Sequence, residues 1–206
     1  MTLDLDLRPE RRAAVVAELR AALEAAEPGS GTGLLGSLAR GEADGWSDID
    51  LRWTVPAARF AAAVRGLRAT LESAGHPVAL LRTDPDPTPP ERRLLFARFA
   101  DLPLFWRLDL EMTADGPVRD SLPPADPWSP HASALANAVG AVKAVRRGRT
   151  GTARGLLERG AERIGLPKDA GGAAIAAEVA RAAPALADYA AEVTALTLHR
   201  WDADGS

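Results

Sequence analysis

Two aspartates separated by one residue are the side chains of this sequence best suited to chemistry. Asp48 and Asp50 flank Ile49 in a segment whose apolar alternation predicts a β-strand over residues 47–55. Side chains two positions apart on a strand point to the same side, so both carboxylates leave one face while Ile49 enters the core. Two carboxylates on one face can hold Mg²⁺, a hard cation that prefers oxygen ligands.

A glycine and a serine precede these acids at a distance that suggests a phosphate site. Gly36 and Ser37 follow a short apolar segment, residues 33–35, which we expect to be a strand, and they open a brief helical stretch over 38–41. The N–H groups of such a turn, with the Ser37 hydroxyl, can bind phosphate oxygens, assisted by the helix dipole. Arg40 lies one turn further on and could contact a phosphate, although an arginine on a short exposed helix is more often solvated.

A third carboxylate comes from a later strand. The segment after Pro103 alternates between apolar residues and the charged residues Arg107, Asp109 and Glu111, which therefore share one face. Asp109 would complete a metal cage with the first two acids. Glu111 is either an additional catalytic acid or a strand residue that faces solvent. Acid-x-acid spacing alone is weak evidence, because Asp4-Leu5-Asp6 shows it too.

The same region also satisfies the dinucleotide fingerprint G-x-G-x-x-G through Gly31, Gly33 and Gly36. That fingerprint must follow the first strand of a βαβ unit, so that the helix N-terminus meets the pyrophosphate. Here a helix and a break over residues 28–31 come first, and the expected strand lies inside the supposed turn. The context therefore disfavours a dinucleotide site.

The remaining patterns predict an α/β core followed by helices. Strong helix formers begin at Pro9, which suits the first turn of a helix. A further helix is expected from Pro56 to Ala74, a strand over 78–82, and a hairpin of strands over 92–100 and 104–112. Beyond a proline-rich stretch, the strand signals vanish. We expect a core domain with a mixed sheet over residues 1–116 and a helical bundle over 117–206, with helices over residues 131–147, 152–165, 172–183 and 185–201.

The glycine–serine turn and the three acids together resemble the nucleotidyltransferase superfamily that includes DNA polymerase β. They are most similar to small bacterial aminoglycoside and lincosamide nucleotidyltransferases and to minimal nucleotidyltransferases. The residues that carry the resemblance lie within 30–112 and read Leu35-Gly36-Ser37, Asp48-Ile49-Asp50-Leu51 and Leu108-Asp109-Leu110. The resemblance implies that Gly36 and Ser37 bind nucleotide phosphates and that Asp48, Asp50 and Asp109 bind metal.

The resemblance also implies a reaction. A hydroxyl of a small acceptor, such as an antibiotic or a sugar, would attack the α-phosphate of ATP or another nucleoside triphosphate in a Mg²⁺-dependent step. Asp50 and Asp109 could hold a second metal at the acceptor, or Asp109 or Glu111 could act as general base; both alternatives stay open. By analogy with the helical domain of the antibiotic-modifying relatives, Lys143 is a phosphate ligand, and a solvated basic helix end explains it equally well.

Composition narrows the partners. The 206 residues carry a net charge of −3, no cysteine and three separated histidines, so neither thiolate metal sites nor a general attraction to nucleic acid is expected. No signal peptide or membrane-spanning run is apparent, and we expect a cytoplasmic protein without membrane or nucleic-acid partners. Two alternatives remain: an enzyme that adenylylates a protein, often a toxin partner, and a catalytically silent nucleotide-binding module.

Overall fold

The computed structural model describes residues 3–86 and 88–199, and the chain divides into two compact units. Residues 4–128 form an α+β unit around a mixed sheet, and the described residues from 129 onward are helical. The expected fold class, a mixed-sheet core followed by helices, is confirmed. Residues 117–128, which the sequence assigns to the helical domain, group instead with the sheet unit. One contact that holds them there is the 2.7 Å hydrogen bond from the Thr83 N–H to Asp126.

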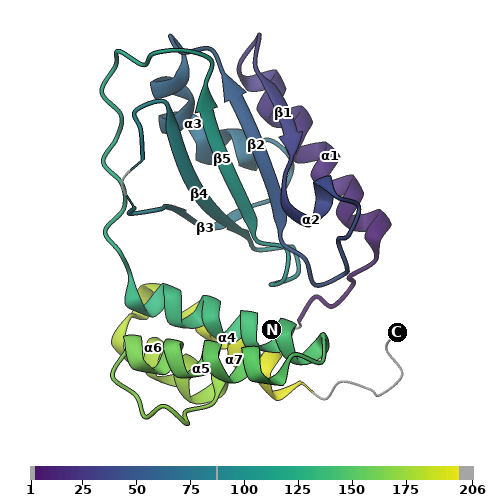
Figure 1. Ribbon diagram of the computed structural model, residues 1–206, viewed down its shortest axis with the longest axis vertical. Coiled ribbons are helices and arrows are strands. Elements are labelled where there is room, and N and C mark those ends of the chain that lie inside the picture. Colours follow the sequence, from purple (N-terminus) through teal and green to yellow (C-terminus); the bar gives the residue numbers. More distant parts are fainter. Residues whose placement is uncertain (1–2, 87, 200–206) are drawn as a thin grey trace. The chain divides into compact units, whose positions relative to one another are not determined.

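The sheet unit contains five strands: β1 (Gly31–Leu34), β2 (Ile49–Val55), β3 (Val78–Thr83), β4 (Arg92–Phe99) and β5 (Leu108–Ala114). Their order across the sheet is β1-β2-β5-β4-β3 (Figure 1). β2 and β5 pair in parallel, and the other neighbouring pairs are antiparallel. A parallel pair needs a crossover connection, which here runs through the helix α3 (Phe60–Glu72), β3 and β4. The two strands expected to carry the acids are therefore direct neighbours.

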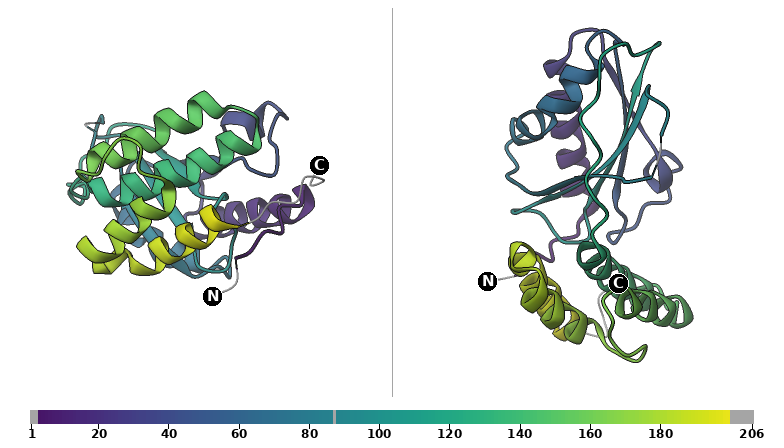
Figure 2. Two further views of the ribbon diagram at one scale, coloured as in Figure 1. Left: turned by 90° about the horizontal axis from the view of Figure 1, so that it is seen from below. Right: turned by 90° about the vertical axis from the view of Figure 1, so that its left-hand side faces the viewer.

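Two helices, α1 (Pro9–Ala26) and α3 (Phe60–Glu72), cover one face of this sheet (Figure 2). Pro9 stands in the first turn of α1, as the sequence predicts. The core lies between the helices and the inward side chains of the strands, and its fully buried members include Leu19, Leu67, Trp53 and Leu110. Polar side chains of β2 and β5 alternate with these apolar ones, so they lie on the opposite face.

The second strand of the expected hairpin starts later than the sequence suggests. The pairing of β4 with β5 is antiparallel, but β5 begins at Leu108 rather than at residue 104. The preceding residues instead turn into the core: the Trp106 N–H bonds to the carbonyl of Pro103 at 2.8 Å, and Phe105 and Trp106 are almost fully buried. Burial of these aromatic rings outweighs continuation of the strand.

The helical unit contains α4 (Pro130–Arg146), α5 (Thr150–Arg163), α6 (Gly172–Ala182), the short 3-10 helix η1 (Pro184–Leu186) and α7 (Ala187–Leu198). The helices expected from the sequence match these four α-helices, except that the last one was expected to run to Trp201, which lies outside the described residues. Among the described helices, none is long and apolar enough to cross a membrane.

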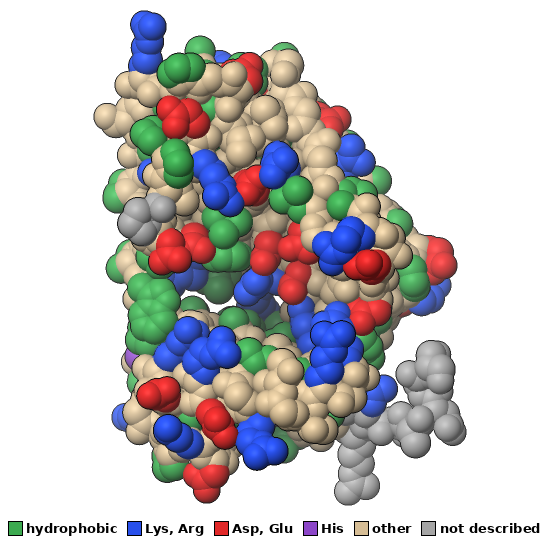
Figure 3. Space-filling model, viewed as in Figure 1, with side chains coloured by type: hydrophobic (Ala, Val, Ile, Leu, Met, Phe, Trp, Pro, Cys, Tyr) green, Lys and Arg blue, Asp and Glu red, His purple; other side chains and the backbone are tan. Residues whose placement is uncertain are grey.

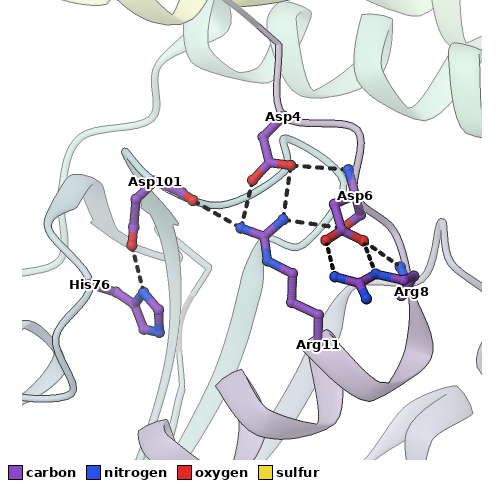
Figure 4. Close-up of polar contacts among 6 residues, drawn as sticks. All are labelled: Asp4, Asp6, Arg8, Arg11, His76 and Asp101. Carbon is purple, nitrogen blue, oxygen red and sulfur yellow. Dashed lines mark hydrogen bonds and ion pairs between the residues drawn. The ribbon is translucent and has the colours of Figure 1, made fainter.

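Ion pairs fasten the segment before α1 (Figure 4). Arg11 bonds to Asp4, with Nη1 2.8 Å from Oδ1 and Nη2 2.6 Å from Oδ2, and its Nη2 also lies 3.4 Å from the carbonyl of Asp101. Arg8 forms a second, bidentate pair with Asp6 at 2.8 and 2.7 Å. The acid-x-acid pair Asp4-Leu5-Asp6 therefore serves as an anchor for the chain at the start of α1.

These contacts set the titration of the two aspartates. Burial raises the pKa of Asp4, but hydrogen bonds from Arg11 and the Asp6 N–H, together with the charge of Arg11, outweigh it and bring the pKa below 3.8. The hydrogen bonds from Arg8 lower the pKa of Asp6 to about 2. Because both folded pKa values are depressed, the stabilisation by these pairs is present above the unfolded pKa and is lost as the pH falls through the folded values.

We expect Arg11→Gln to raise the pKa of Asp4 above its usual value, because burial then acts without the opposing cation. Carboxyl carbon NMR during an acid titration measures this. Asp6, whose main partner is Arg8, serves as the internal control, and its midpoint should rise far less, because the charge of Arg11 is the smallest cause of its lowered pKa. An unchanged Asp4 midpoint in the variant would contradict the assigned pairing.

Candidate active site

The parallel pairing of β2 with β5 places two of the predicted acids side by side. Asp50 is the register partner of Asp109, and the Ile49 N–H bonds to the Arg107 carbonyl at 2.9 Å. Both aspartates lie on the face opposite the helices, on strands that are about 4.8 Å apart. Asp48 precedes β2 directly, and acidic side chains gather at the end of the sheet where β2 and β5 begin (Figure 3). The sheet thus brings the acidic residues of two strands to one place.

The glycine–serine turn lies against the second of these acids. The Leu35 N–H bonds to the Asp50 carbonyl at 2.9 Å, which ties the turn to β2. Gly36 has φ +54°, and a Cβ built on it would lie 2.4 Å from Oδ2 of Asp50. Gly36 is therefore required twice, for its left-handed backbone and for the room that it leaves the carboxylate. The turn and Asp50 form one packed feature.

Ser37 begins a very short helix, α2 (Gly36–Ala39). Because α2 is a single turn, it supplies little of the helix dipole that was expected to assist phosphate binding. Phosphate binding there would depend on the Ser37 hydroxyl and on individual N–H groups. Within the described part of the chain, the Ser37 hydroxyl has no hydrogen-bond partner. It therefore remains available to a ligand.

The loop between α2 and Asp48 is anchored by a buried arginine. Arg12 of α1, only 3% exposed, donates to the carbonyls of Ala43 and Asp44. Asp44 in turn accepts the Ser47 hydroxyl at 2.9 Å, and the indole N–H of Trp106 bonds to the carbonyl of Gly45 at 2.9 Å. The loop is thus a fixed spacer that sets where Asp48 enters the strand.

The carboxylate of Asp109 is held by Arg107, which comes directly before β5 in the chain. Arg107 donates through Nε to Oδ1 at 2.6 Å and through Nη2 to Oδ2 at 2.7 Å, and its guanidinium lies 4.8 Å from the centre of the Phe96 ring. Burial raises the pKa of Asp109; the contacts with Arg107 oppose this rise, and the charges of Asp48 and Asp50 add to it. The net direction is upward, so Asp109 holds a proton more readily than an ordinary aspartate.

The carboxylates of Asp48, Asp50 and Asp109 are chemically suited to a hard cation, but they are not arranged around a common site for one. Carboxylate oxygens are the ligands that Mg²⁺ prefers. In the described residues, however, no three histidine, cysteine or acidic side chains are placed to hold a metal ion. Both oxygens of Asp109 accept hydrogen bonds from Arg107, so a cation in a three-carboxylate cage would compete with this arginine for Asp109. The metal roles of Asp48, Asp50 and Asp109 stay predictions.

Glu111 lies one row along the same face and is engaged by two arginines. Arg52 donates through Nε to Oε1, and Arg92 through Nη2 to Oε2, each at 2.6 Å. Burial raises the pKa of Glu111, but the hydrogen bonds and charges of the two arginines outweigh it, and the net shift is downward. A carboxylate with both oxygens paired and a lowered pKa is a poor proton acceptor. The structure therefore favours the non-catalytic alternative for Glu111.

The two basic residues expected to bind phosphate, Arg40 and Lys143, lie in different units and differ in exposure. Arg40 caps α2 and pairs with Glu42 at 2.6 Å, with both side chains exposed, so it is next to the turn but engaged at the surface. Lys143 lies near the end of α4 in the helical unit, and its side chain is buried rather than solvated. Phosphate binding by either residue stays a prediction.

The contacts between these acids and the surrounding arginines were not predicted from the sequence. The alternation of β5 already places Arg107 on the face of Asp109, and this signal was available. Arg92 approaches Glu111 only because β4 pairs with β5, and Arg12 reaches the loop only because α1 packs beside it, so no local pattern reveals either contact.

No family model matches the chain, and no curated protein matches it. Among solved structures, the chain is similar to one in the structure of the GLD-2/RNP-8 complex. The TM-score is 0.39 at 17% identity, over 56% of this chain and 34% of that one. The chain therefore spans about a third of that protein's length, and a likeness this weak leaves the functional conclusion to the residues of this chain.

The contact between Gly36 and Asp50 gives a matched pair of substitutions. We expect Gly36→Ala to lower the free energy of unfolding by about 1–3 kcal/mol, because alanine is strained at positive φ and its Cβ displaces the Asp50 carboxylate. Gly33→Ala is the control, since a Cβ there meets nothing within 4 Å. Urea unfolding measures both. Equal stability of the two variants would contradict the close approach.

Proposed function

We propose that this chain is a nucleotidyltransferase, which transfers a nucleoside monophosphate from ATP or another nucleoside triphosphate to a hydroxyl of a small acceptor in a Mg²⁺-dependent reaction. The acceptor oxygen bonds to the α-phosphorus, the bond to the β-phosphate breaks, and pyrophosphate leaves. The observation that carries the proposal is the parallel register of Asp50 with Asp109, with the Asp50 carboxylate packed on the Gly36–Ser37 turn. Acids from two strands beside a turn with an unpartnered hydroxyl are what a metal-bound triphosphate requires.

Each residue of the group has a role that follows from its place. Ser37 would donate its hydroxyl to a phosphate oxygen. Gly36 leaves room for the Asp50 carboxylate beside this turn. Asp48 and Asp50 would hold the cation. Bound there, Mg²⁺ supplies positive charge for the triphosphate and for the attacking oxygen.

Asp109 is better suited than Glu111 to accept the proton of the acceptor hydroxyl. Its raised pKa matches a general base more closely than the lowered pKa of Glu111 does. Asp109 also lies in the row of Asp50, whereas Glu111 lies one row away and is paired with Arg52 and Arg92. This role for Asp109 requires that Arg107 leave its carboxylate.

The hold of Arg107 on Asp109 also supports a second candidate, a nucleotide-binding module without catalysis. An arginine bound to both oxygens of the third acid provides the positive charge that a second cation would otherwise bring. Such a module would bind a nucleoside triphosphate through Ser37 and the first two acids but transfer nothing.

Substitution of the central acid tests the enzymatic proposal. We expect Asp50→Asn to reduce transfer by at least about a thousandfold, because a neutral amide holds a cation poorly at the α-phosphate. The measurement is label transfer from α-³²P-ATP with Mg²⁺ to a mixture of small hydroxylated acceptors, with mass spectrometry for a gain of one nucleoside monophosphate. A lane with cell lysate detects labelled protein.

The control for this substitution is Asp120→Asn, the same chemical change at an exposed site of the sheet unit. It should keep the wild-type rate. Transfer by Asp50→Asn at the rate of the control would refute the role of Asp50. Nucleotide binding without transfer in the wild type, across all acceptors, would instead favour the silent module.

Arg107 gives a second, independent test that needs no acceptor. We expect Arg107→Gln to bind Mn²⁺, a spectroscopic substitute for Mg²⁺, roughly tenfold more tightly, about 1.4 kcal/mol, because a competing cation is removed from Asp109. Electron paramagnetic resonance of free Mn²⁺ measures the affinity. Arg65→Gln, an exposed arginine on α3, is the matched control and should bind like wild type. Weaker binding by Arg107→Gln would exclude competition between the arginine and the cation.

A further inference from the structure

Three side chains beyond the paired acids on the open face carry excess positive charge. Arg52 and Glu111 are register partners, and Arg92 lies one row further along β4. Glu111 is 13% exposed and lies between Arg52 and Arg92, whose side chains are 48% and 47% exposed. One carboxylate neutralises one guanidinium, so the trio of Arg52, Arg92 and Glu111, here called the arginine row, has a net charge of +1. A purely structural ion pair would need only one of the two arginines.

Each guanidinium of the arginine row keeps donors for another partner. An arginine has five N–H donors in a fixed fork. Arg52 uses Nε and Arg92 uses Nη2 on Glu111. In the described residues, their other guanidinium nitrogens have no hydrogen-bond partner. Glu111 thus orients two guanidinium groups while leaving several of their N–H donors without a partner in the part of the chain that the structure describes. Planar guanidinium groups suit the oxygens of a phosphate or a carboxylate.

The arginine row lies beside the candidate active site and has room around it. Arg52 and Glu111 each follow the paired acids by two residues, which is roughly 7 Å along the strands. Gly33 of the edge strand β1 is the register partner of Arg52, and a Cβ at Gly33 would meet nothing within 4 Å. A small molecule could therefore lie on this face with one group at Arg52 and Arg92 and a hydroxyl near Asp109.

We propose that Arg52 and Arg92 bind an anionic group of the acceptor, a phosphate or a carboxylate, so that the substrate is an anionic small molecule rather than a cationic aminoglycoside. This inference rests on the proposed nucleotidyl transfer. The triphosphate belongs to the glycine–serine turn beside Asp50, and the arginine row lies further along the strand. At this place on the face, the two guanidinium forks favour an anionic group of the acceptor over an ammonium group.

Inorganic phosphate is the probe for this site, because it tests the anion contact without assuming the shape of the acceptor. The protein is first saturated with Mg²⁺ and α,β-methylene-ATP, which occupies a triphosphate site without reacting. The ¹⁵N–¹H signals of the arginine Nε groups are then followed as phosphate is added. We expect saturable shifts at Arg52 and Arg92.

Arg59 is the matched control, since it is also an exposed arginine paired with a nearly buried glutamate, Glu27, but it lies at the start of α3. Its signal should not move. Arg52→Gln and Arg92→Gln should each weaken phosphate binding about tenfold and leave the affinity for the ATP analogue unchanged. Arg59→Gln should change neither.

Several outcomes would overturn the inference. One is the absence of shifts at the arginine row, and another is an equal shift at Arg59. A third is phosphate binding that disappears once the ATP analogue is bound, because the row would then belong to the triphosphate.

Failure of the analogue itself to bind would instead refute the proposed function, while the phosphate titration of the protein alone would still report on the row. In the acceptor mixture, labelled products should carry an anionic group; a labelled aminoglycoside would contradict the assignment.

Discussion

The parallel pairing of β2 with β5 is the constraint on which the candidate site depends. Side chains alternate between the faces of a strand, so a slip of one residue would turn Asp109 into the core while Asp50 stayed on the open face. The apolar partners fix this register: Ile49 faces Leu108, and Trp53 faces Met112, with all four fully buried. The burial of these side chains on one side therefore holds the carboxylates together on the other, against their mutual repulsion.

That repulsion is partly relieved by arginines, which gives the open face its charge pattern. Arg107 pairs with Asp109, and Arg52 and Arg92 share Glu111 in the next row. The pKa values follow this division, because Asp109 is raised by burial and by its acidic neighbours, whereas the arginines lower Glu111. The two acids of β5 lie on the same face, yet their environments shift their pKa values in opposite directions.

This difference explains what the sequence could and could not predict. The alternation of β2 and β5 is local, so it correctly assigned Asp50, Asp109 and Glu111 to the polar faces of these strands. Which strands become neighbours depends on the crossover, and which arginine meets which acid depends on the pairing of β4 with β5. The sequence therefore predicts the members of the candidate site, but their protonation and partners appear only in the assembled sheet.

The segment between the turn and the acids is held in place by hydrogen bonds that its composition does not reveal. If the residues between Gly36 and Asp48 were a flexible loop, ordering them on ligand binding would cost conformational entropy. The carbonyl groups of this loop are instead bound by Arg12 and by the indole of Trp106, both buried, and the turn itself is tied to β2 through the Asp50 carbonyl. The sheet, the turn and the spacer are therefore ordered before any ligand arrives. In the proposed function, a cation that binds Asp109 would have to compete with Arg107 for this carboxylate, while the surrounding frame is already held by its own hydrogen bonds.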